Sequence, residues 1–231
     1  MKYNTYIFDL DGTLLDTLTD LAASCNYALR THGMPEHSID DVRQFVGNGV
    51  RKLMERAIPG GDANPDFEAT FATFREHYMH HSLDTTKPYP GIPEMLTELK
   101  SRGCKLAVVS NKMMAATVEL CRHFFPDTIE VAIGEHEAEG IRKKPAPDTV
   151  FAALRELNVT ISPPESGGAR GGLNNVQSAV YVGDSDVDIA TARNSGLPCI
   201  SVLWGFRDRD FLIEHGAETF VSFPSELLHF S

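Results

Sequence analysis

The chain has 231 residues, of which 42% are hydrophobic and 23% charged, and its formal net charge is −11. This composition is typical of a globular protein with room for one α/β domain and a small second domain. The acidic balance argues against nucleic acid and anionic membranes as partners, because a phosphate backbone requires a basic patch. No apolar run approaches the roughly 18 residues of a membrane span. The N-terminus leads directly into a strand and not into a signal peptide, so we expect a cytoplasmic protein.

The first part of the chain predicts one strand followed by helices. Residues 3–10 combine β-branched and aromatic side chains and end in DLDGT, which indicates a strand and a glycine turn. Apolar residues then recur at helical spacing from Leu18 to Leu29, and similar patterns follow at 41–45, 50–58 and 67–78. No convincing strand lies between residues 16 and 83. We therefore expect a helical insert there.

From residue 88 onward, strands and helices alternate. Expected strands lie at 105–109, 130–134, 178–182 and 199–202, and expected helices at 94–102, 115–124, 149–157, 187–194 and 224–228. The strands are nearly continuous apolar runs, which indicates a parallel sheet covered by helices on both faces. The Gly-rich segment 162–177 exceeds the usual ~2–6 residues between helix and strand. We interpret it as a tolerated surface insertion, with a functional loop as the alternative.

Polar residues follow four of the expected elements, at the edge where ligands bind to an open parallel sheet. These residues are Asp9 with Asp11, Ser110 with Asn111, the Lys143–Lys144 segment, and Asp184 with Asp186 and Asp188. Taken singly, each group could have a role unrelated to catalysis, such as a capping turn or a solvated lysine. Together they predict a cluster of acids, a hydroxyl and an ammonium group at one edge of the sheet.

The string Asp9 to Thr13 is the first of these groups. Alternation along an extended chain points Asp9 and Asp11 to the same side. Gly12 permits a tight turn whose backbone amides can hold an anion. Two carboxylates so close repel each other unless a cation or a shared proton intervenes. A helix-capping turn is the alternative for this string alone.

The acids after the strand at 178–182 are the second group. Asp184 and Asp188 supply the oxygen ligands that Mg²⁺ prefers. Capping of the following helix is the alternative, and we assign Asp186 to that role. Lys144 stands just before a proline-initiated helix, whose amides together with the ammonium group suit a phosphoryl group.

Four ordered motifs resemble those of the haloacid dehalogenase superfamily: DLDGT (9–13), VVSN (108–111), KKPAPD (143–148) and GDSDVD (183–188). The strings LLDTLTDL, VGNGVRKL, PYPGIPEML and VVSNK are similar to the phosphoglycolate phosphatase branch. This resemblance implies a Rossmann-like, doubly wound α/β core formed by residues 1–15 and 85–231. It also implies a small all-helical cap, residues 16–84, inserted after the first strand.

The resemblance also implies a role for each motif residue in the reaction. Asp9 is then the nucleophile that takes the phosphoryl group, and Asp11 the general acid and, in the second step, the general base. Ser110 and Lys144 bind the phosphoryl oxygens, and Asn111 assists them. Splitting hydrolysis into two transfers is covalent catalysis, and a cation must offset the repulsion between the attacking carboxylate and the phosphate.

The implied cofactor is Mg²⁺. Its ligands are Asp9, the backbone carbonyl of Asp11, and Asp184, while Asp188 supports the ion through water or from behind the direct ligands. Closure of the cap then excludes bulk water. We expect the amides of the turn Gly47-Asn48-Gly49, together with Arg51, to meet the non-phosphate end of the substrate. A flexible turn with solvated basic residues is the alternative.

The expected function is Mg²⁺-dependent hydrolysis of a small phosphate monoester through an aspartyl-phosphate, with 2-phosphoglycolate as the leading substrate. Phosphosugars, pyrophosphate and nucleoside monophosphates stay open as substrates. A β-phosphoglucomutase-like mutase is the closest rival, but that branch has a histidine where this chain has Leu21. The non-enzymatic alternative is a phosphate-binding regulatory protein. The sequence leaves monomer and homodimer equally open.

Overall fold

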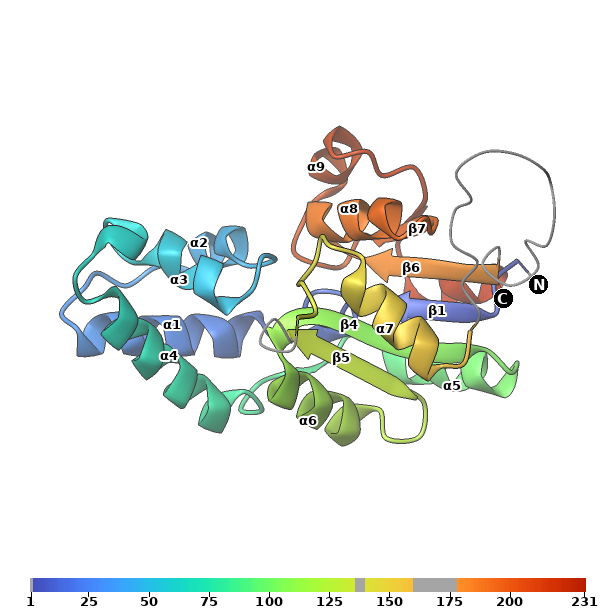
Figure 1. Cartoon of the computed structure of the whole chain (residues 1–231), viewed down its shortest axis with the longest axis horizontal. Helices are drawn as coiled ribbons and strands as arrows, with labels where there is room; N and C mark the ends of the chain where they lie inside the picture. Colours follow the sequence, from blue (N-terminus) through green and yellow to red (C-terminus); the bar gives the residue numbers. More distant parts are fainter. Residues whose placement is uncertain (1, 136–139, 160–177) are drawn as a thin grey trace.

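The computed structural model describes residues 2–135, 140–159 and 178–231, and its centre is a six-stranded sheet (Figure 1). The strand order is β5-β4-β1-β6-β7-β8, and every neighbouring pair is parallel. The bounds are β1 Thr5–Phe8, β4 Lys105–Met113, β5 Val131–Glu135, β6 Ala179–Gly183, β7 Cys199–Val202 and β8 Phe220–Val221. Strand β1 lies between β4 and β6, so the chain order changes direction beside it. Ligands bind at such a switch point in open α/β sheets.

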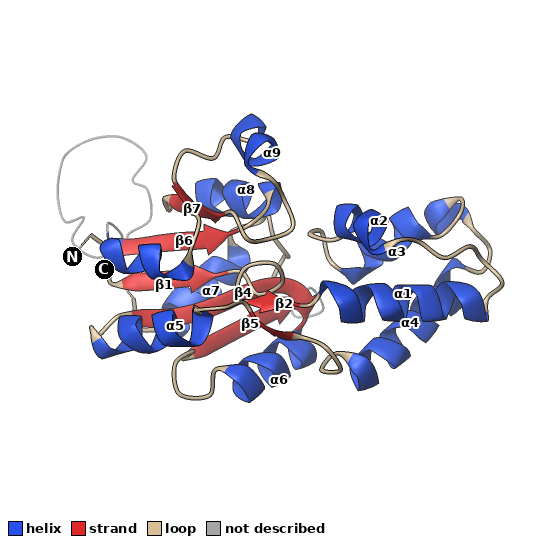
Figure 2. Ribbon diagram, turned by 180° about the vertical axis from the view of Figure 1, so that it is seen from behind, coloured by secondary structure: helices blue, strands red, loops and turns tan. Residues whose placement is uncertain are grey.

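Alternation along the strands sends side chains to opposite faces of the sheet. Tyr6 and Phe8 pack in one hydrophobic cluster, and Ile7 packs in another. Helices α5 (Ile92–Ser101), α6 (Met114–Phe124) and the 3₁₀ helix η4 (Pro224–His229) cover the first face. Helices α7 (Asp148–Glu156) and α8 (Asp186–Asn194) cover the second face (Figure 2). This two-sided cover confirms the predicted doubly wound α/β fold.

A separate group of helices lies beyond the carboxyl ends of the strands (Figure 1). It comprises α1 (Leu18–Thr31), α2 (Ile39–Phe45), α3 (Val50–Ala57), the 3₁₀ helix η1 (Gly61–Ala63) and α4 (Phe67–His81). These helices bury a hydrophobic cluster of their own, which includes Cys25, Met54 and Phe74. We call them the cap and the sheet with its helices the core. The domain limits at residues 16 and 84 stay predictions.

The two chain segments that join the core to the cap are tied together. Strand β2 (Leu15–Asp16) pairs with β3 (Lys87–Pro88) in an antiparallel ribbon, which is too short for a sequence pattern to reveal. The buried carboxylate of Asp20 accepts hydrogen bonds from the backbone amides and hydroxyls of Thr85 and Thr86, at 2.5 to 3.1 Å. The start of α1 is therefore fixed to the returning segment.

Three further features differ from the sequence prediction. Strand β4 continues to Met113, with a register shift after Val109, and this extension carries Ser110 and Asn111. Helix α9 (Arg209–Glu214) and strand β8 had not been predicted, because six and two residues are too few for a recognisable period. The Gly-rich segment 162–177 lies outside the described residues.

Candidate active site

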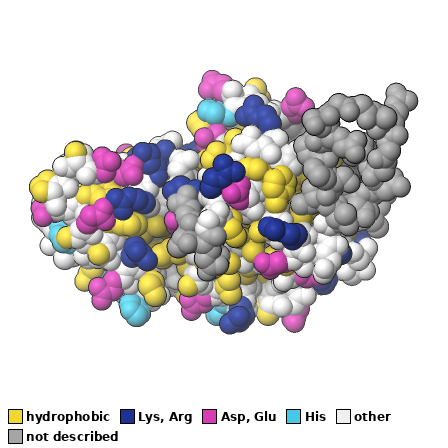
Figure 3. All heavy atoms as spheres, viewed as in Figure 1, with side chains coloured by type: hydrophobic (Ala, Val, Ile, Leu, Met, Phe, Trp, Pro, Cys, Tyr) yellow, Lys and Arg dark blue, Asp and Glu magenta, His cyan; other side chains and the backbone are white. Residues whose placement is uncertain are grey.

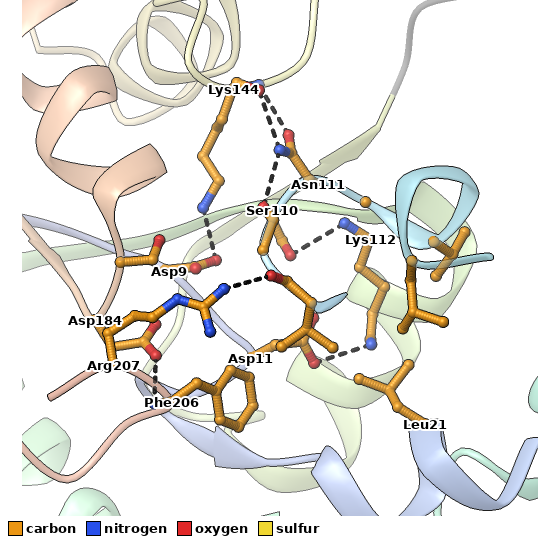
Figure 4. Close-up of a pocket in the computed structure, with 16 residues that line it drawn as sticks. Asp9, Asp11, Leu21, Ser110, Asn111, Lys112, Lys144, Asp184, Phe206 and Arg207 are labelled. Atoms are coloured by element: carbon orange, nitrogen blue, oxygen red, sulfur yellow. Dashed lines mark hydrogen bonds and ion pairs between the residues drawn. The ribbon is translucent and has the colours of Figure 1, made fainter. Parts of the chain in front are cut away.

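A pocket opens between the carboxyl end of the sheet and the cap (Figure 4). It encloses about 570 Å³, which includes its open mouth. Six of the residues predicted to act in catalysis, phosphate binding or metal binding line it: Asp9, Asp11, Ser110, Asn111, Lys144 and Asp184. The cap adds Leu21, Val46, Gly47, Gly49, Val50 and Leu53, and the core adds Lys112, Ser185, Phe206 and Arg207. The structure therefore gathers the strand-end residues, although their assigned roles stay predictions.

Asp9 and Lys144 form a buried ion pair at the end of β1. The Lys144 ammonium lies 2.8 Å from Asp9 Oδ1 and 2.9 Å from Asp188 Oδ1, and it donates a hydrogen bond to the Tyr181 hydroxyl at 3.1 Å. Burial by itself would lower the pKa of Lys144, but the two carboxylates raise it above the ordinary value. Lys144 is therefore a permanent cation beside Asp9.

Three carboxylates, from Asp9, Asp184 and Asp188, have oxygens within 4.8 Å of one another. Burial raises the pKa of Asp9 well above its ordinary value, and the nearby charge of Asp188 raises it further. The same two causes raise the pKa of Asp184 to about 7. Clustered, buried carboxylates of this kind are stable in their ionised form only beside a cation. The all-oxygen donor set fits Mg²⁺.

Asp188 is held from two sides. Its Oδ2 accepts hydrogen bonds from the backbone amides of Asp184 and Ser185, at 3.2 and 3.1 Å, and from the Ser185 hydroxyl at 2.6 Å. The bond to the Ser185 amide is the reciprocal half of a capping box on α8. The assignment of Asp186 to capping is therefore wrong, because Asp188, three residues after Ser185, has the spacing that reaches back. Burial would raise the pKa of Asp188, but Lys144 and these hydrogen bonds lower it.

Asp184 is enclosed by backbone. Its Oδ2 accepts a hydrogen bond from the Phe206 amide at 2.7 Å, and the Thr13 hydroxyl donates to its Oδ1 at 3.3 Å. Gly12 has a φ of +82°, and a Cβ there or on Gly205 would overlap the Asp184 side chain. Both positions therefore require glycine if Asp184 is to keep this place.

Asp11 is linked to the cap through Lys112. Its Oδ1 accepts hydrogen bonds from the Thr17 hydroxyl at 2.6 Å and from the Lys112 ammonium at 2.9 Å. Lys112 also donates to the hydroxyl of Tyr78, on α4, at 2.7 Å. Sequence reasoning missed both residues. Lys112 could have been found because it directly follows Ser110 and Asn111, whereas Tyr78 carries no local signal.

Asn111 faces the backbone of the Lys144 segment. Its Oδ1 accepts a hydrogen bond from the Lys144 amide at 2.8 Å, and its Nδ2 donates to the Lys144 carbonyl at 3.1 Å. The same Nδ2 reaches the carbonyl of Gly47 in the cap at 3.5 Å. The geometry therefore supports a role in positioning Lys144. The hydroxyl of Ser110 lies nearby and accepts a hydrogen bond from the Lys112 amide at 3.2 Å.

Arg51 does not line this pocket, and its expected contact with the substrate stays a prediction. The Arg51 guanidinium pairs with the Glu68 carboxylate at 2.5 and 3.3 Å and lies over the ring of Phe67, outside the pocket. Gly47 and Gly49 do line the pocket. The arginine that enters it is Arg207, from the segment after β7, which had not been considered.

On the face shown in Figure 3, acidic and basic side chains are interspersed over the described residues. Among the described helices, none combines the length and apolar character needed to cross a membrane. The expected cytoplasmic location and the choice between monomer and homodimer stay predictions.

Comparison with known proteins places the chain in a family. A family model described as haloacid dehalogenase-like hydrolase matches residues 6–202. The chain is 34% identical over 201 residues to the phosphoglycolate phosphatase of Aquifex aeolicus, covering 87% of this chain and 84% of that protein. It is 36% identical over 208 residues to the phosphoglycolate phosphatase of Caulobacter vibrioides, covering 88% and 81%.

A solved structure agrees with these relatives. The crystal structure of a candidate phosphoglycolate phosphatase from Lactobacillus delbrueckii subsp. bulgaricus matches with a TM-score of 0.87 at 35% identity, over 98% of this chain and 97% of that one. The chain therefore belongs to the haloacid dehalogenase-like hydrolase family. Within that family it falls among phosphatases, so its reaction class is that of a phosphoric monoester hydrolase.

Proposed function

We propose that this protein is a Mg²⁺-dependent phosphatase that hydrolyses small phosphate monoesters through an aspartyl-phosphate on Asp9. The leading substrate is 2-phosphoglycolate, the compound named in the relatives from Aquifex aeolicus and Caulobacter vibrioides. The observation that carries the proposal is the buried pair of Asp9 and Lys144, 2.8 Å apart, inside a capped pocket with two further carboxylates. A carboxylate can attack a phosphate only where cations offset their repulsion.

The first half of the proposed reaction transfers the phosphoryl group to the protein. An oxygen of Asp9 attacks the phosphorus atom, the bond from phosphorus to the ester oxygen breaks, and Asp11 gives its proton to that oxygen. In the second half, Asp11 takes a proton from a water molecule that attacks the phosphorus, so phosphate leaves and the Asp9 carboxylate returns. Lys144 and Ser110 hold the phosphoryl oxygens in both halves.

The residues that would hold Mg²⁺ are Asp9, Asp184 and the backbone carbonyl of Asp11, with Asp188 behind them. When bound, the ion neutralises charge on the phosphoryl group. Supporting this assignment, the raised pKa values of Asp9 and Asp184 reflect carboxylates that lack sufficient positive charge around them. The positive charge of Lys144 alone is not sufficient to neutralise these carboxylates.

Hydrolysis is favoured over a mutase reaction by Leu21. This residue lines the pocket from α1 at the position where the mutase branch has a histidine. An apolar side chain cannot exchange protons with a sugar hydroxyl, so Leu21 gives Asp11 no help in returning the phosphoryl group to a second hydroxyl.

The test is phosphate release from p-nitrophenyl phosphate and 2-phosphoglycolate, with Mg²⁺ and with a chelator. We expect activity only with the metal, and activity at background for Asp9→Asn. Asp62→Asn, on the exposed η1 turn of the cap, is the matched control and should keep the parent rate. A folded Asp9→Asn variant with parental turnover would contradict the mechanism.

The choice of substrate is tested separately, with a panel of phosphate esters. The kcat/KM values of 2-phosphoglycolate, hexose phosphates, pyrophosphate and nucleoside monophosphates should be ranked, because this ratio measures discrimination directly. We expect 2-phosphoglycolate to rank first. A higher value for a hexose phosphate would move the substrate assignment while leaving the reaction class intact.

A further inference from the structure

Arg207 brings a cation into the pocket from the core side. It follows Phe206, whose backbone amide binds Asp184 Oδ2 at 2.7 Å, so its starting point is fixed beside the carboxylate cluster. The guanidinium projects into the pocket toward the cap (Figure 4). A Cβ on Gly47 would lie 3.9 Å from its Nη2, which places the turn at Gly47 directly against it.

Three hydrogen bonds hold this guanidinium at the junction of core and cap. Nη1 donates to the carbonyl of Arg43 at 2.8 Å, and Nη2 donates to the carbonyls of Val46 at 2.9 Å and Gln44 at 3.4 Å. These carbonyls lie at the C-terminal end of α2, where helix carbonyls lack partners and the helix dipole is negative. Arg207 is therefore fixed by neutral backbone groups.

Part of the donor set of Arg207 remains unused, and its guanidinium forms no direct ion pair within the described residues. A guanidinium has five N–H donors, and the buried Nε–H of Arg207 has no partner among the described residues. No carboxylate of the described residues forms an ion pair with it, whereas the other pocket cations do: Lys112 pairs with Asp11, and Lys144 with Asp9 and Asp188. Asp184 and Asp186 are close enough to attract Arg207 electrostatically, but neither lies within ion-pair distance of it. A partly buried cation with a spare donor and no direct ion pair favours an anionic ligand.

The rest of the cap-side wall is apolar. Its side chains are those of Leu21, Val46, Val50 and Leu53, and Phe206 of the core packs against the hydrophobic cluster of the cap. A substrate with several hydroxyls would leave them without hydrogen-bond partners against this wall, which is costly. A substrate that carries one compact anionic group besides the phosphate could instead bind Arg207.

We propose that Arg207 is the specificity-determining residue that binds a second anionic group of the substrate, a carboxylate close to the phosphate ester. This inference rests on the proposed phosphatase function. The phosphoryl group lies at Asp9 and Lys144, and the carboxylate points toward the junction of core and cap. The preferred substrates are therefore small phosphorylated acids, and Arg207 takes the role that sequence reasoning had given to Arg51.

The experiment compares two substrates that differ only at the end opposite the phosphate. These are 2-phosphoglycolate and 2-hydroxyethyl phosphate, in which a neutral hydroxymethyl group replaces the carboxylate. We expect Arg207→Met to lower kcat/KM for 2-phosphoglycolate about 10- to 100-fold, the usual loss for a charge-assisted hydrogen bond. The value for 2-hydroxyethyl phosphate should change only a few-fold.

Two controls show what the substitution has changed. Arg209→Met removes the same charge from an exposed side chain over the ring of Phe220 and should leave both substrates unaffected. The inhibition constant of inorganic phosphate should be the same in the parent and in Arg207→Met, because phosphate occupies the subsite at Lys144. If Arg207→Met folds poorly, Arg207→Lys replaces it, and the ratio of the two kcat/KM values remains valid because it is independent of the active fraction.

The possible outcomes distinguish a failure of the inference about Arg207 from a failure of the proposed phosphatase function. A parent enzyme that hydrolyses neither these two esters nor p-nitrophenyl phosphate contradicts the proposed function, whereas one that hydrolyses p-nitrophenyl phosphate but neither ester overturns the inference alone. A parent enzyme that uses both esters equally well, or an Arg207 variant that loses both in equal proportion, overturns the inference and leaves Arg207 as a link between core and cap.

Discussion

The ammonium group of Lys112, on strand β4 of the core, lies 2.7 Å from the hydroxyl of Tyr78, on helix α4 of the cap. The same ammonium group lies 2.9 Å from Asp11 Oδ1. Both side chains are buried, so the contact is made in a low-dielectric environment where hydrogen bonds to charged groups are strong. The position of the proposed acid–base residue is thus coupled to the position of a cap helix.

This coupling predicts that Lys112→Met lowers kcat about 10- to 100-fold, because a displaced Asp11 is poorly aligned with the leaving oxygen. Tyr78→Phe should have a smaller, few-fold effect on kcat and lower the free energy of unfolding by about 1–2 kcal/mol, since it leaves one ammonium donor unpaired. Steady-state kinetics and urea unfolding measure the two effects.

The matched control is Lys105→Met, at the opposite end of the same strand, where the ammonium group binds the Leu157 carbonyl at 2.6 Å. It should leave kcat unchanged. If Lys112→Met retained the parent kcat, the coupling would have no role in the reaction.

The raised pKa of Asp184, about 7, predicts how metal binding depends on pH. Below pH 7 the carboxyl group of the metal-free protein holds a proton that Mg²⁺ must displace, so the apparent affinity should fall about tenfold per unit. Titration calorimetry at pH 6 and pH 8 measures this difference. An affinity that is the same at both values would contradict the assignment of Asp184 as a ligand.

The raised pKa of Asp184 also predicts how the stability of the metal-free protein changes with pH. The folded protein holds this proton up to about pH 7, whereas the unfolded chain releases it near 3.8, so the contribution of Asp184 to stability is lost as pH rises between these values. Asp184→Asn should remove this part of the pH dependence, and saturating Mg²⁺ should reverse it in the parent. Melting temperatures at pH 5 and pH 8 provide the comparison.

The contribution of Asp20 to stability changes with pH in the opposite direction to that of Asp184. Burial would raise its pKa, but the hydrogen bonds from Thr85 and Thr86 lower it, so its stabilising effect is present above the unfolded value of 3.8 and is lost as pH falls through the lower folded value. Asp20→Asn should cost about 2–3 kcal/mol at pH 7, because an amide cannot accept all of these bonds. Urea unfolding should show this difference shrinking toward pH 3. A difference independent of pH would point to packing and not to charge.

Gly12→Ala should disable the site locally. At φ +82° an alanine is strained by about 1–2 kcal/mol, and its Cβ overlaps the Asp184 carboxylate, so Mg²⁺ affinity and kcat should both fall. Gly33→Ala is the control, because Gly33 has a φ of +69° with nothing within 4 Å of the added Cβ. The Gly33→Ala variant should lose about as much stability as Gly12→Ala and should keep full activity. Equal activity in the two variants would exclude a role for the close packing at Gly12.

The sequence by itself determined the α/β class and the principal site residues, with a simple physical reason for each. Continuous apolar runs alternating with helical periods require a parallel sheet covered on both faces. The carboxyl ends of parallel strands meet at one edge, so polar residues after separate strands, such as Asp9, Ser110 and Asp184, must lie near one another. Local patterns contain this information because both periodicities are local.

Only the tertiary structure decided which residues face one another across the chain. Arg207 contacts a helix end more than 160 residues earlier, and Tyr78 reaches Lys112 only because α4 lies against the end of β4. Arg51 is turned away because its helix places it beside Glu68. Such contacts depend on how packed elements are oriented and not on the residues beside each position, so no local pattern predicts them.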